Sequence, residues 1–248
     1  NAHADELFST AHEYYNRKHP DNPITTETSQ YIIKHAFTCL TKLDDNKALR
    51  NRMSLVEITE VIGVKEISNQ MVTDVLGIYS LTGNTLIRPF NISEQLYASK
   101  SNEVFFPDTV IEITHESLIR NWKQLDHWVK EEHDSLEVFY DFQSQLNRWK
   151  NFNESGEYLL SEGPFNYFYD WYKKRKPSVS WIKKFLQQYD SNISQTDDNA
   201  NKIAQALNND IVRFFERSKK VINRTKSFYR AGVVLICVLF VLTLIGFF

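Results

Sequence analysis

The stretch Val110-Ile-Glu-Ile-Thr-His-Glu-Ser-Leu-Ile-Arg-Asn-Trp122 changes from a pattern typical of a β-strand to one typical of an α-helix. Its first half is β-branched apart from Glu112, which favours a strand ending at Thr114. Its second half begins an apolar spacing that is typical of a helix and that continues beyond the stretch through Leu118, Trp122, Leu125 and Val129. We therefore expect a helix to begin near His115, directly after a strand.

The junction between strand and helix places two polar side chains, His115 and Glu116, at a helix start. The first N–H groups of a helix have no partner within it, and the positive end of the helix dipole lies beside them. Such a position suits contact with an anion. A capped amphipathic helix that begins with a surface histidine fits the same pattern, so the geometry leaves both interpretations open.

The amino-acid sequence of this junction resembles a known motif. His115-Glu-Ser-Leu-Ile-Arg-Asn-Trp122 resembles the HEALIRxW segment of the novel STAND NTPases of type one, which are bacterial signal-transduction ATPases with numerous domains. Ser155-Gly-Glu-Tyr-Leu-Leu160 is similar to a second segment of that family, GRDxxYLLRG. The resemblance covers roughly residues 28–220 and implies a relative of plant disease-resistance proteins and apoptosome scaffolds.

The resemblance also implies a role for one histidine. In the wider STAND class a Met-His-Asp motif closes the winged-helix domain, and its histidine contacts the β-phosphate of bound ADP. Here Thr114-His115-Glu116 stands in that place, with Thr for Met and Glu for Asp. The resemblance thus assigns nucleotide sensing to His115, with Thr114, Glu116 and Arg120 as candidate supporting residues.

We expect Arg120 to have a structural role and not to contact the phosphate. It lies five residues after His115, about 140° round a helix of 3.6 residues per turn, so both side chains cannot face one phosphate. We expect Arg120 to contact an acidic partner on a neighbouring element or on an ATPase domain.

Composition fits an ordinary folded protein. The chain has 248 residues, of which 42% are hydrophobic and 24% charged, enough for one large or two small domains. Only seven Gly and six Pro indicate a mainly helical fold. Cys39 and Cys237 form no disulfide or metal framework and favour a reducing compartment. Because residue 1 is Asn, we expect the chain to be a piece of a longer protein.

Helix and strand signals occur in the order of a winged helix. Ser54-Leu-Val-Glu57 is a capping-box pattern, and residues 44–52 look like a charged loop. A polar loop over residues 91–102 separates two expected strands. The expected elements are helices over residues 25–43, 54–62 and 69–83, followed by strands over residues 85–90 and 104–114.

The full prediction is a mainly α protein with a small β-hairpin wing, a helical bundle and a C-terminal transmembrane helix. The aromatic residues between positions 136 and 185 recur at helical spacing and are expected to pack in the bundle core. The predicted divisions are residues 1–24 (end of an upstream domain or linker), 25–114 (winged helix), 115–190 (helical bundle), 191–202 (mobile linker), 203–230 (basic juxtamembrane helix) and 231–248 (transmembrane helix).

Charge and hydropathy change sharply near the C-terminal end of the chain. Residues 211–230 contain seven basic residues against Glu216 alone, a net charge of +6, although the whole chain has a net charge of −2. Residues 231–248 contain no charge and would span about 27 Å as a helix, close to a bilayer core of about 30 Å. By the positive-inside rule residues 1–230 are expected in the cytoplasm. The membrane-proximal basic residues are Arg213, Arg217, Lys219, Lys220, Arg224, Lys226 and Arg230.

Catalytic motifs are missing from the sequence. None of the glycines begins the GxxxxGK[ST] loop that cradles phosphates in an NTPase, and no histidine has a spacing typical of a metal site. We therefore expect no catalytic residue, metal or cofactor in this chain. An ATPase domain upstream, with ATP or ADP and Mg²⁺, would supply the chemistry of the full-length protein.

Winged helices often bind DNA, so a membrane-bound transcription regulator is one alternative function. From Glu60 to Ser80, which includes the would-be recognition helix, the net charge is −2, and such a face repels phosphates. A second alternative is a membrane-tethered interaction module with no nucleotide role. The favoured interpretation is the regulatory part of a membrane-anchored STAND-type ATPase in a bacterial inner membrane. Its expected partners are the upstream ATPase domain, membrane lipids and further copies of itself on activation, but no nucleic acid.

Overall fold

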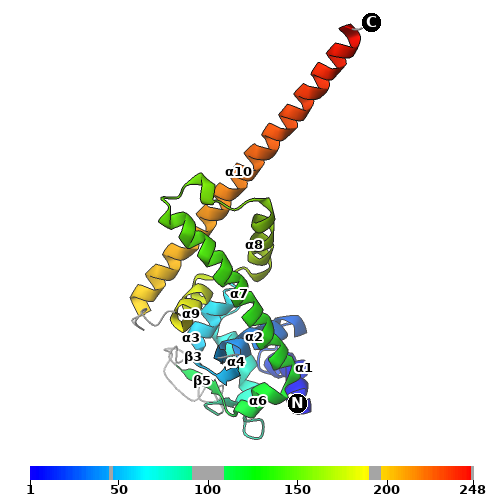
Figure 1. The fold of residues 1–248 in the computed structure, drawn as a ribbon. Helices are drawn as coiled ribbons and strands as arrows, with labels where there is room; N and C mark the ends of the chain where they lie inside the picture. The colour runs from blue at the N-terminus through cyan, green and yellow to red at the C-terminus, as the bar shows by residue number, and fades with distance from the viewer. Residues whose placement is uncertain (45–46, 91–108, 190–196, 247–248) are drawn as a thin grey trace. The chain divides into compact units, whose positions relative to one another are not determined.

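The computed structural model describes residues 1–44, 47–90, 109–189 and 197–246 (Figure 1). Over these residues the protein is mainly α-helical with two small antiparallel sheets, which confirms the predicted fold class. The chain forms two compact units. Unit 1 comprises Asn1–Leu136 and Ser178–Thr196, and unit 2 comprises Glu137–Pro177 and Asp197–Phe248.

Four helices form the centre of unit 1: α1 (Ala2–Lys18), α2 (Thr26–Cys39), α3 (Leu55–Ile62) and α4 (Asn69–Ser80). Ser54 and Glu57 form the complete capping box that the sequence predicts, and the Thr25 side chain caps α2 by accepting from the N–H of Thr28. Gly63 ends α3 in the left-handed region, with φ of 65°. The shared core includes Ile32, Ile33, Phe37, Leu55, Ile58, Val72, Leu76 and Tyr79.

The helix α4 lies deep in unit 1. Every residue from Val72 to Ser80 is buried, and α4 packs against α1, α2 and α3. Nε2 of His19, at the end of α1, lies 2.9 Å from a carboxylate oxygen of the buried Asp74. The segment expected to belong to an upstream domain or linker therefore contributes a packed helix to unit 1.

In the described part of the chain, five short strands form the two sheets. The first sheet pairs β1 (Thr41–Asp44) with β2 (Lys47–Arg50), so part of the charged loop expected over residues 44–52 is instead a hairpin strand. In the second sheet, of strand order β3-β5-β4, the central strand β5 (Val110–Ile113) pairs with β3 (Arg52–Ser54) and β4 (Ile87–Arg88). The predicted loop over residues 91–102 and the first part of the predicted second strand lie outside the described residues.

Helices α6 (Glu116–Asn121), α7 (Lys123–Asn151) and α9 (Val179–Tyr189) follow, and α9 packs on α3 within unit 1. The helix predicted to run on from His115 is interrupted at Trp122, where the backbone is extended (φ −96°, ψ 95°). Trp122 is fully buried, and its indole N–H donates to Asp5 over 2.7 Å. The rings around it are those of Phe8, Phe37, Tyr79 and Trp128.

Unit 2 contains the end of α7, the short 3₁₀ helix η1 (Gly156–Tyr158), α8 (Glu162–Arg175) and α10 (Asp197–Gly246). Its core is aromatic, as predicted: the Phe142 ring stacks on Phe215 with centroids 4.7 Å apart, and Trp149 lies 5.1 Å from Phe214. The helix α10 continues without a break to Gly246 (Figure 1). It begins at Asp197, so residues 197–202 of the predicted linker are helical, whereas residues 190–196 lie outside the described residues.

Candidate functional site

The junction at His115 directly follows β5, the central strand of the second sheet. Strand β5 buries Ile111 and Ile113, and the backbone N–H of Thr114 donates to the carbonyl oxygen of Leu86 over 3.0 Å. His115 then caps α6 through its backbone, in an extended conformation with φ of −133° and ψ of 131°. Its imidazole is exposed and makes no capping hydrogen bond, so the ring can meet a ligand or another domain.

An arginine that the sequence analysis did not select reaches this junction. Arg50, at the end of β2, donates from Nη1 to the carbonyl oxygens of Ile113 (3.3 Å) and Thr114 (3.1 Å). These are the two peptide groups directly before His115, so Arg50 fixes the backbone from which the imidazole projects. The hydroxyl oxygen of Thr114 is enclosed and has no hydrogen-bond partner among the described residues.

The two other predicted site residues pair with each other. Nη2 of Arg120 lies 3.3 Å from Oε2 of Glu116, one helical turn earlier. Within the described residues Arg120 thus contacts its own helix, and the expected contact with an acidic group of an ATPase domain stays a prediction. Because the Arg120 side chain is 73% exposed, this pair is a surface ion pair that contributes little to stability.

In unit 2, part of the basic segment is committed to internal contacts. The guanidinium groups of Arg213 and Arg217 lie 2.6 and 3.0 Å from the carboxylate of Glu154, and both lie over the ring of Trp149. Lys226 pairs with Glu162 at the start of α8. These three cations hold α10 against the rest of its own unit.

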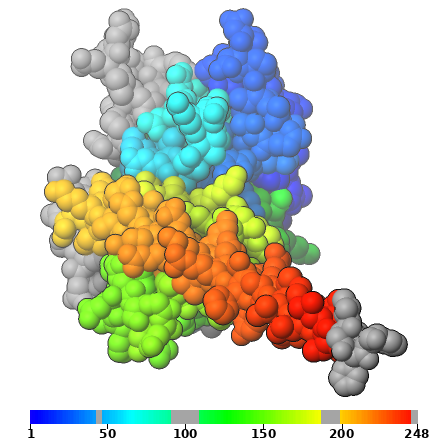
Figure 2. Space-filling model, turned by 90° about the horizontal axis from the view of Figure 1, so that it is seen from above, coloured from blue at the N-terminus to red at the C-terminus, as the bar shows by residue number. Residues whose placement is uncertain are grey.

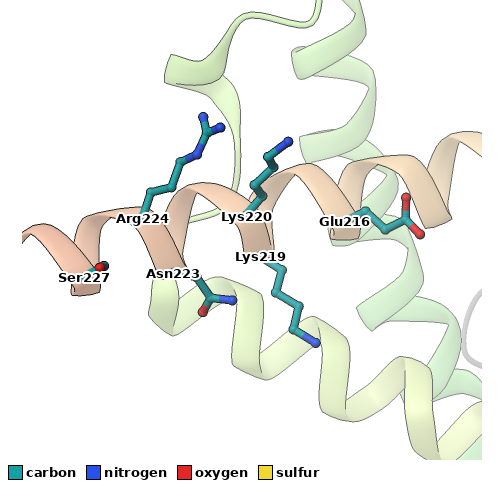
Figure 3. Close-up of a pocket in the computed structure, with 6 residues that line it drawn as sticks. All are labelled: Glu216, Lys219, Lys220, Asn223, Arg224 and Ser227. Carbon is teal, nitrogen blue, oxygen red and sulfur yellow. The ribbon is translucent and has the colours of Figure 1, made fainter.

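Within residues 211–230, four other basic residues are exposed and form no ion pair with a described residue: Lys219, Lys220, Arg224 and Arg230. Lys219, Lys220 and Arg224 line a shallow depression of about 490 Å³, together with Glu216, Asn223 and Ser227 (Figure 3). Lys220 and Arg224 project to one side of the helix and Lys219 and Asn223 to the other, whereas the Glu216 side chain extends along the helix (Figure 3).

The last part of α10 is apolar and uncovered. Val233, Leu235, Ile236 and Phe240 are each at least 60% exposed, and in Figure 2 the orange and red surface of the helix is open to solvent. Among the described residues this helix alone is long and apolar enough to cross a membrane, and none of its apolar window is buried. A helix of this kind needs a further apolar partner, which can be a bilayer or another protein.

The described residues contain no group of three or more side chains that could hold a metal ion. Neither curated proteins nor solved structures provide a match to the chain. A family model described as Novel STAND NTPase 1 does match, over residues 6–157. The matched region extends from α1 through the junction at His115 to η1 and makes up more than half of the sequence. The chain therefore belongs to the Novel STAND NTPase 1 family.

Proposed function

We propose that this chain is the regulatory part of a membrane-anchored STAND-type signalling ATPase. Family membership supports the relation to STAND NTPases, while the sequence contains no GxxxxGK[ST] loop of its own. The ATPase domain with its bound ATP or ADP and Mg²⁺ would therefore lie upstream of this chain. Unit 1 would act on that domain as a nucleotide-sensing lock, and further copies of the protein would assemble when the lock opens.

The topology of unit 1 supports a winged helix. Helices α2, α3 and α4 come first, with β3 between α2 and α3, and the strands β4 and β5 follow. Strand β5 returns between β3 and β4, so the last strand is the central one. Three helices with a small antiparallel sheet in this order form the core of winged-helix domains.

Burial of α4 supports a role other than DNA binding. A helix that reads DNA must offer an open face to the major groove. Residues Val72–Ser80 are buried instead, α1 packs on α4, and the only carboxylate among them, Asp74, faces His19. We infer that this winged helix contacts the nucleotide and the neighbouring ATPase domain.

The observation that carries the proposal is the exposed imidazole of His115, which makes no capping hydrogen bond and follows the central strand of a sheet. A neutral imidazole donates one hydrogen bond, and phosphate oxygens accept such bonds well. A bond made to ADP but altered with ATP would favour the resting state, because a ligand shifts an equilibrium only through its different affinities for the two states. Couplings of this kind are about 1–3 kcal/mol.

The test is the substitution His115→Ala in the full-length protein. We expect ADP to dissociate about 5- to 150-fold faster, with signalling in the absence of a stimulus, as measured by the release of fluorescent ADP. The matched control is His127→Ala, because His127 is also exposed but pairs with Glu131 on α7. If His115→Ala lowers the melting temperature while the ADP off-rate stays normal, His115 is a structural cap and the nucleotide-sensing role is rejected.

The membrane part of the proposal rests on the apolar end of α10. Residues 231–248 would span the bacterial inner membrane as one helix, with residues 1–230 in the cytoplasm. Its support is the run of basic residues directly before the uncharged segment, since Lys and Arg remain on the cytoplasmic side of membrane helices.

A further inference from the structure

The basic residues of α10 fall into two sets that the sequence does not distinguish. Arg213, Arg217 and Lys226 are paired with carboxylates of their own unit. Lys220, Arg224 and Arg230 are exposed and have no such partner among the described residues. The first set supports the fold of unit 2, so the second set is available to an external anion.

The second set has a geometry that favours an anion. Lys220 and Arg224 are four residues apart and project to the same side of α10 (Figure 3). Like charges at this spacing repel each other and weaken a helix. An anion placed between the two groups removes that repulsion. Arg in particular offers a planar fork of N–H donors that matches the oxygens of a phosphate group.

The second set also has a defined distance from the apolar segment. With a rise of about 1.5 Å per residue, Arg230 lies about 1.5 Å before residue 231, Arg224 about 10 Å and Lys220 about 16 Å. The polar layer on each side of a bilayer is about 5–8 Å thick, and charges act over a further Debye length of about 8 Å. The three cations therefore lie within reach of the headgroup layer, with Lys220 at its outer limit.

Lys219 does not belong to this set. It lies one residue further from the apolar segment than Lys220, and it projects to the opposite side of the helix from Lys220 and Arg224 (Figure 3). Glu216, four residues before Lys220, is the one carboxylate among the residues that line the depression, and Arg224 lies a further turn away from it.

We propose that Lys220 and Arg224 form a binding face for the phosphate groups of anionic phospholipids, with Arg230 as a further cation nearer the apolar segment. This inference rests on the proposed membrane span, and it adds a preference for one class of lipid to that span. The face lies within about 16 Å of the apolar segment, so the phosphate of a lipid whose acyl chains lie beside residues 231–248 can approach these cations. The occupant is a lipid headgroup in a bilayer, because that is the phosphate source that the position along α10 selects.

The experiment compares lipids around the full chain in nanodiscs. Spin-labelled phosphatidylglycerol and phosphatidylcholine report how strongly each lipid associates with the protein. We expect the wild-type chain to prefer phosphatidylglycerol. The double variant Lys220→Gln/Arg224→Gln is expected to reduce that preference about 5-fold for each cation removed, until none remains, because each cation near a charged surface contributes about 1 kcal/mol.

A matched control removes the same charge elsewhere in unit 2. Lys173 and Lys174 are exposed on α8, so Lys173→Gln/Lys174→Gln lowers the net charge by the same amount. This control should leave the lipid preference unchanged. An equal loss in both double variants would overturn the proposal, because net charge and not the face would then set the preference. An unchanged preference in Lys220→Gln/Arg224→Gln would overturn it as well.

Two competition arms distinguish other phosphate sources. Inorganic phosphate, exchanged for chloride at constant ionic strength, should not abolish the preference; if it does, the face binds free phosphate. Duplex DNA should not compete either; if it does, the face binds nucleic acid. A separate measurement tests the membrane span itself. If alkaline carbonate releases the wild-type chain from membranes, the proposed membrane anchor is contradicted.

Discussion

The helix α10 contains two segments that share one backbone and differ in what covers them. In the first segment, Ile211, Phe214 and Phe215 are buried within unit 2. In the second segment, Val233, Leu235 and Phe240 are 60%, 61% and 63% exposed. No break separates the two segments, because α10 is one helix from Asp197 to Gly246 (Figure 1).

This difference shows that the backbone of a helix does not depend on whether protein or lipid surrounds it. A helix satisfies its backbone hydrogen bonds internally, so it is stable in a protein core and in lipid alike. The side chains decide which medium suits each segment. The first segment has a stripe of apolar residues with charges around it, whereas the second is apolar on all sides, which is typical of a membrane helix.

The largest expected effect tests the covered segment. Phe214→Ala should destabilise unit 2 by about 3–5 kcal/mol, because it leaves a cavity beside Trp149. The measurement is urea unfolding of the full chain in detergent micelles. Phe240→Ala, the same change in the uncovered segment, should leave the free energy of unfolding of unit 2 unchanged. Equal losses in the two variants would show that the uncovered segment also packs on protein.

The next effect tests the uncovered segment. Leu239 lies at the middle of residues 231–248, and Leu239→Lys should cost about 2.5–3.5 kcal/mol of membrane insertion. The readout is the fraction of chain that resists extraction by alkaline carbonate. Thr225→Lys adds the same charge among the existing basic residues and should have no effect. Full retention of the Leu239→Lys variant would argue that this segment binds protein and not lipid.

The smallest effect concerns the ion pairs that hold the covered segment. Glu154→Gln removes the carboxylate shared by Arg213 and Arg217, and we expect a loss of about 0.5–1 kcal/mol, because both guanidinium groups remain partly solvated. The loss should shrink as salt is added, since ions screen exposed charges. Glu216→Gln is the control, because Glu216 is exposed and has no ion pair with a described residue. A loss of equal size in both variants would contradict a specific role for Glu154.

Local signals in the sequence predicted much of the helical structure. Ser54 and Glu57 form the predicted capping box, Gly63 ends α3, and Ser68 caps α4. The chemistry of these positions acts within a few residues, so it can be read without knowledge of the fold. The site prediction at His115 has the same origin, because the change from a strand period to a helix period lies within one short stretch.

Features that depend on distant residues were not predicted. The extended backbone at Trp122 accompanies burial of its ring and the bond to Asp5, which lies 117 residues earlier. The role of Arg50 depends on the pairing of β1 with β2, in a segment that looked like a charged loop. One signal was available there, because Asp and Asn, the residue types at positions 45 and 46, are common in the turns of hairpins.

The order of the two units along the chain has a consequence for biosynthesis. Unit 1 is discontinuous, because residues 137–177 of unit 2 separate α9 from the remainder of unit 1. A ribosome adds about 5–20 residues per second. Synthesis of residues 137–177 therefore takes roughly 2–8 s, and this is the interval between the first and the last segment of unit 1. During that interval the surface of α3 that α9 later covers is open to chaperones. The uncharged residues 231–248 are synthesised after α9, so unit 1 can complete its core before the membrane segment leaves the ribosome.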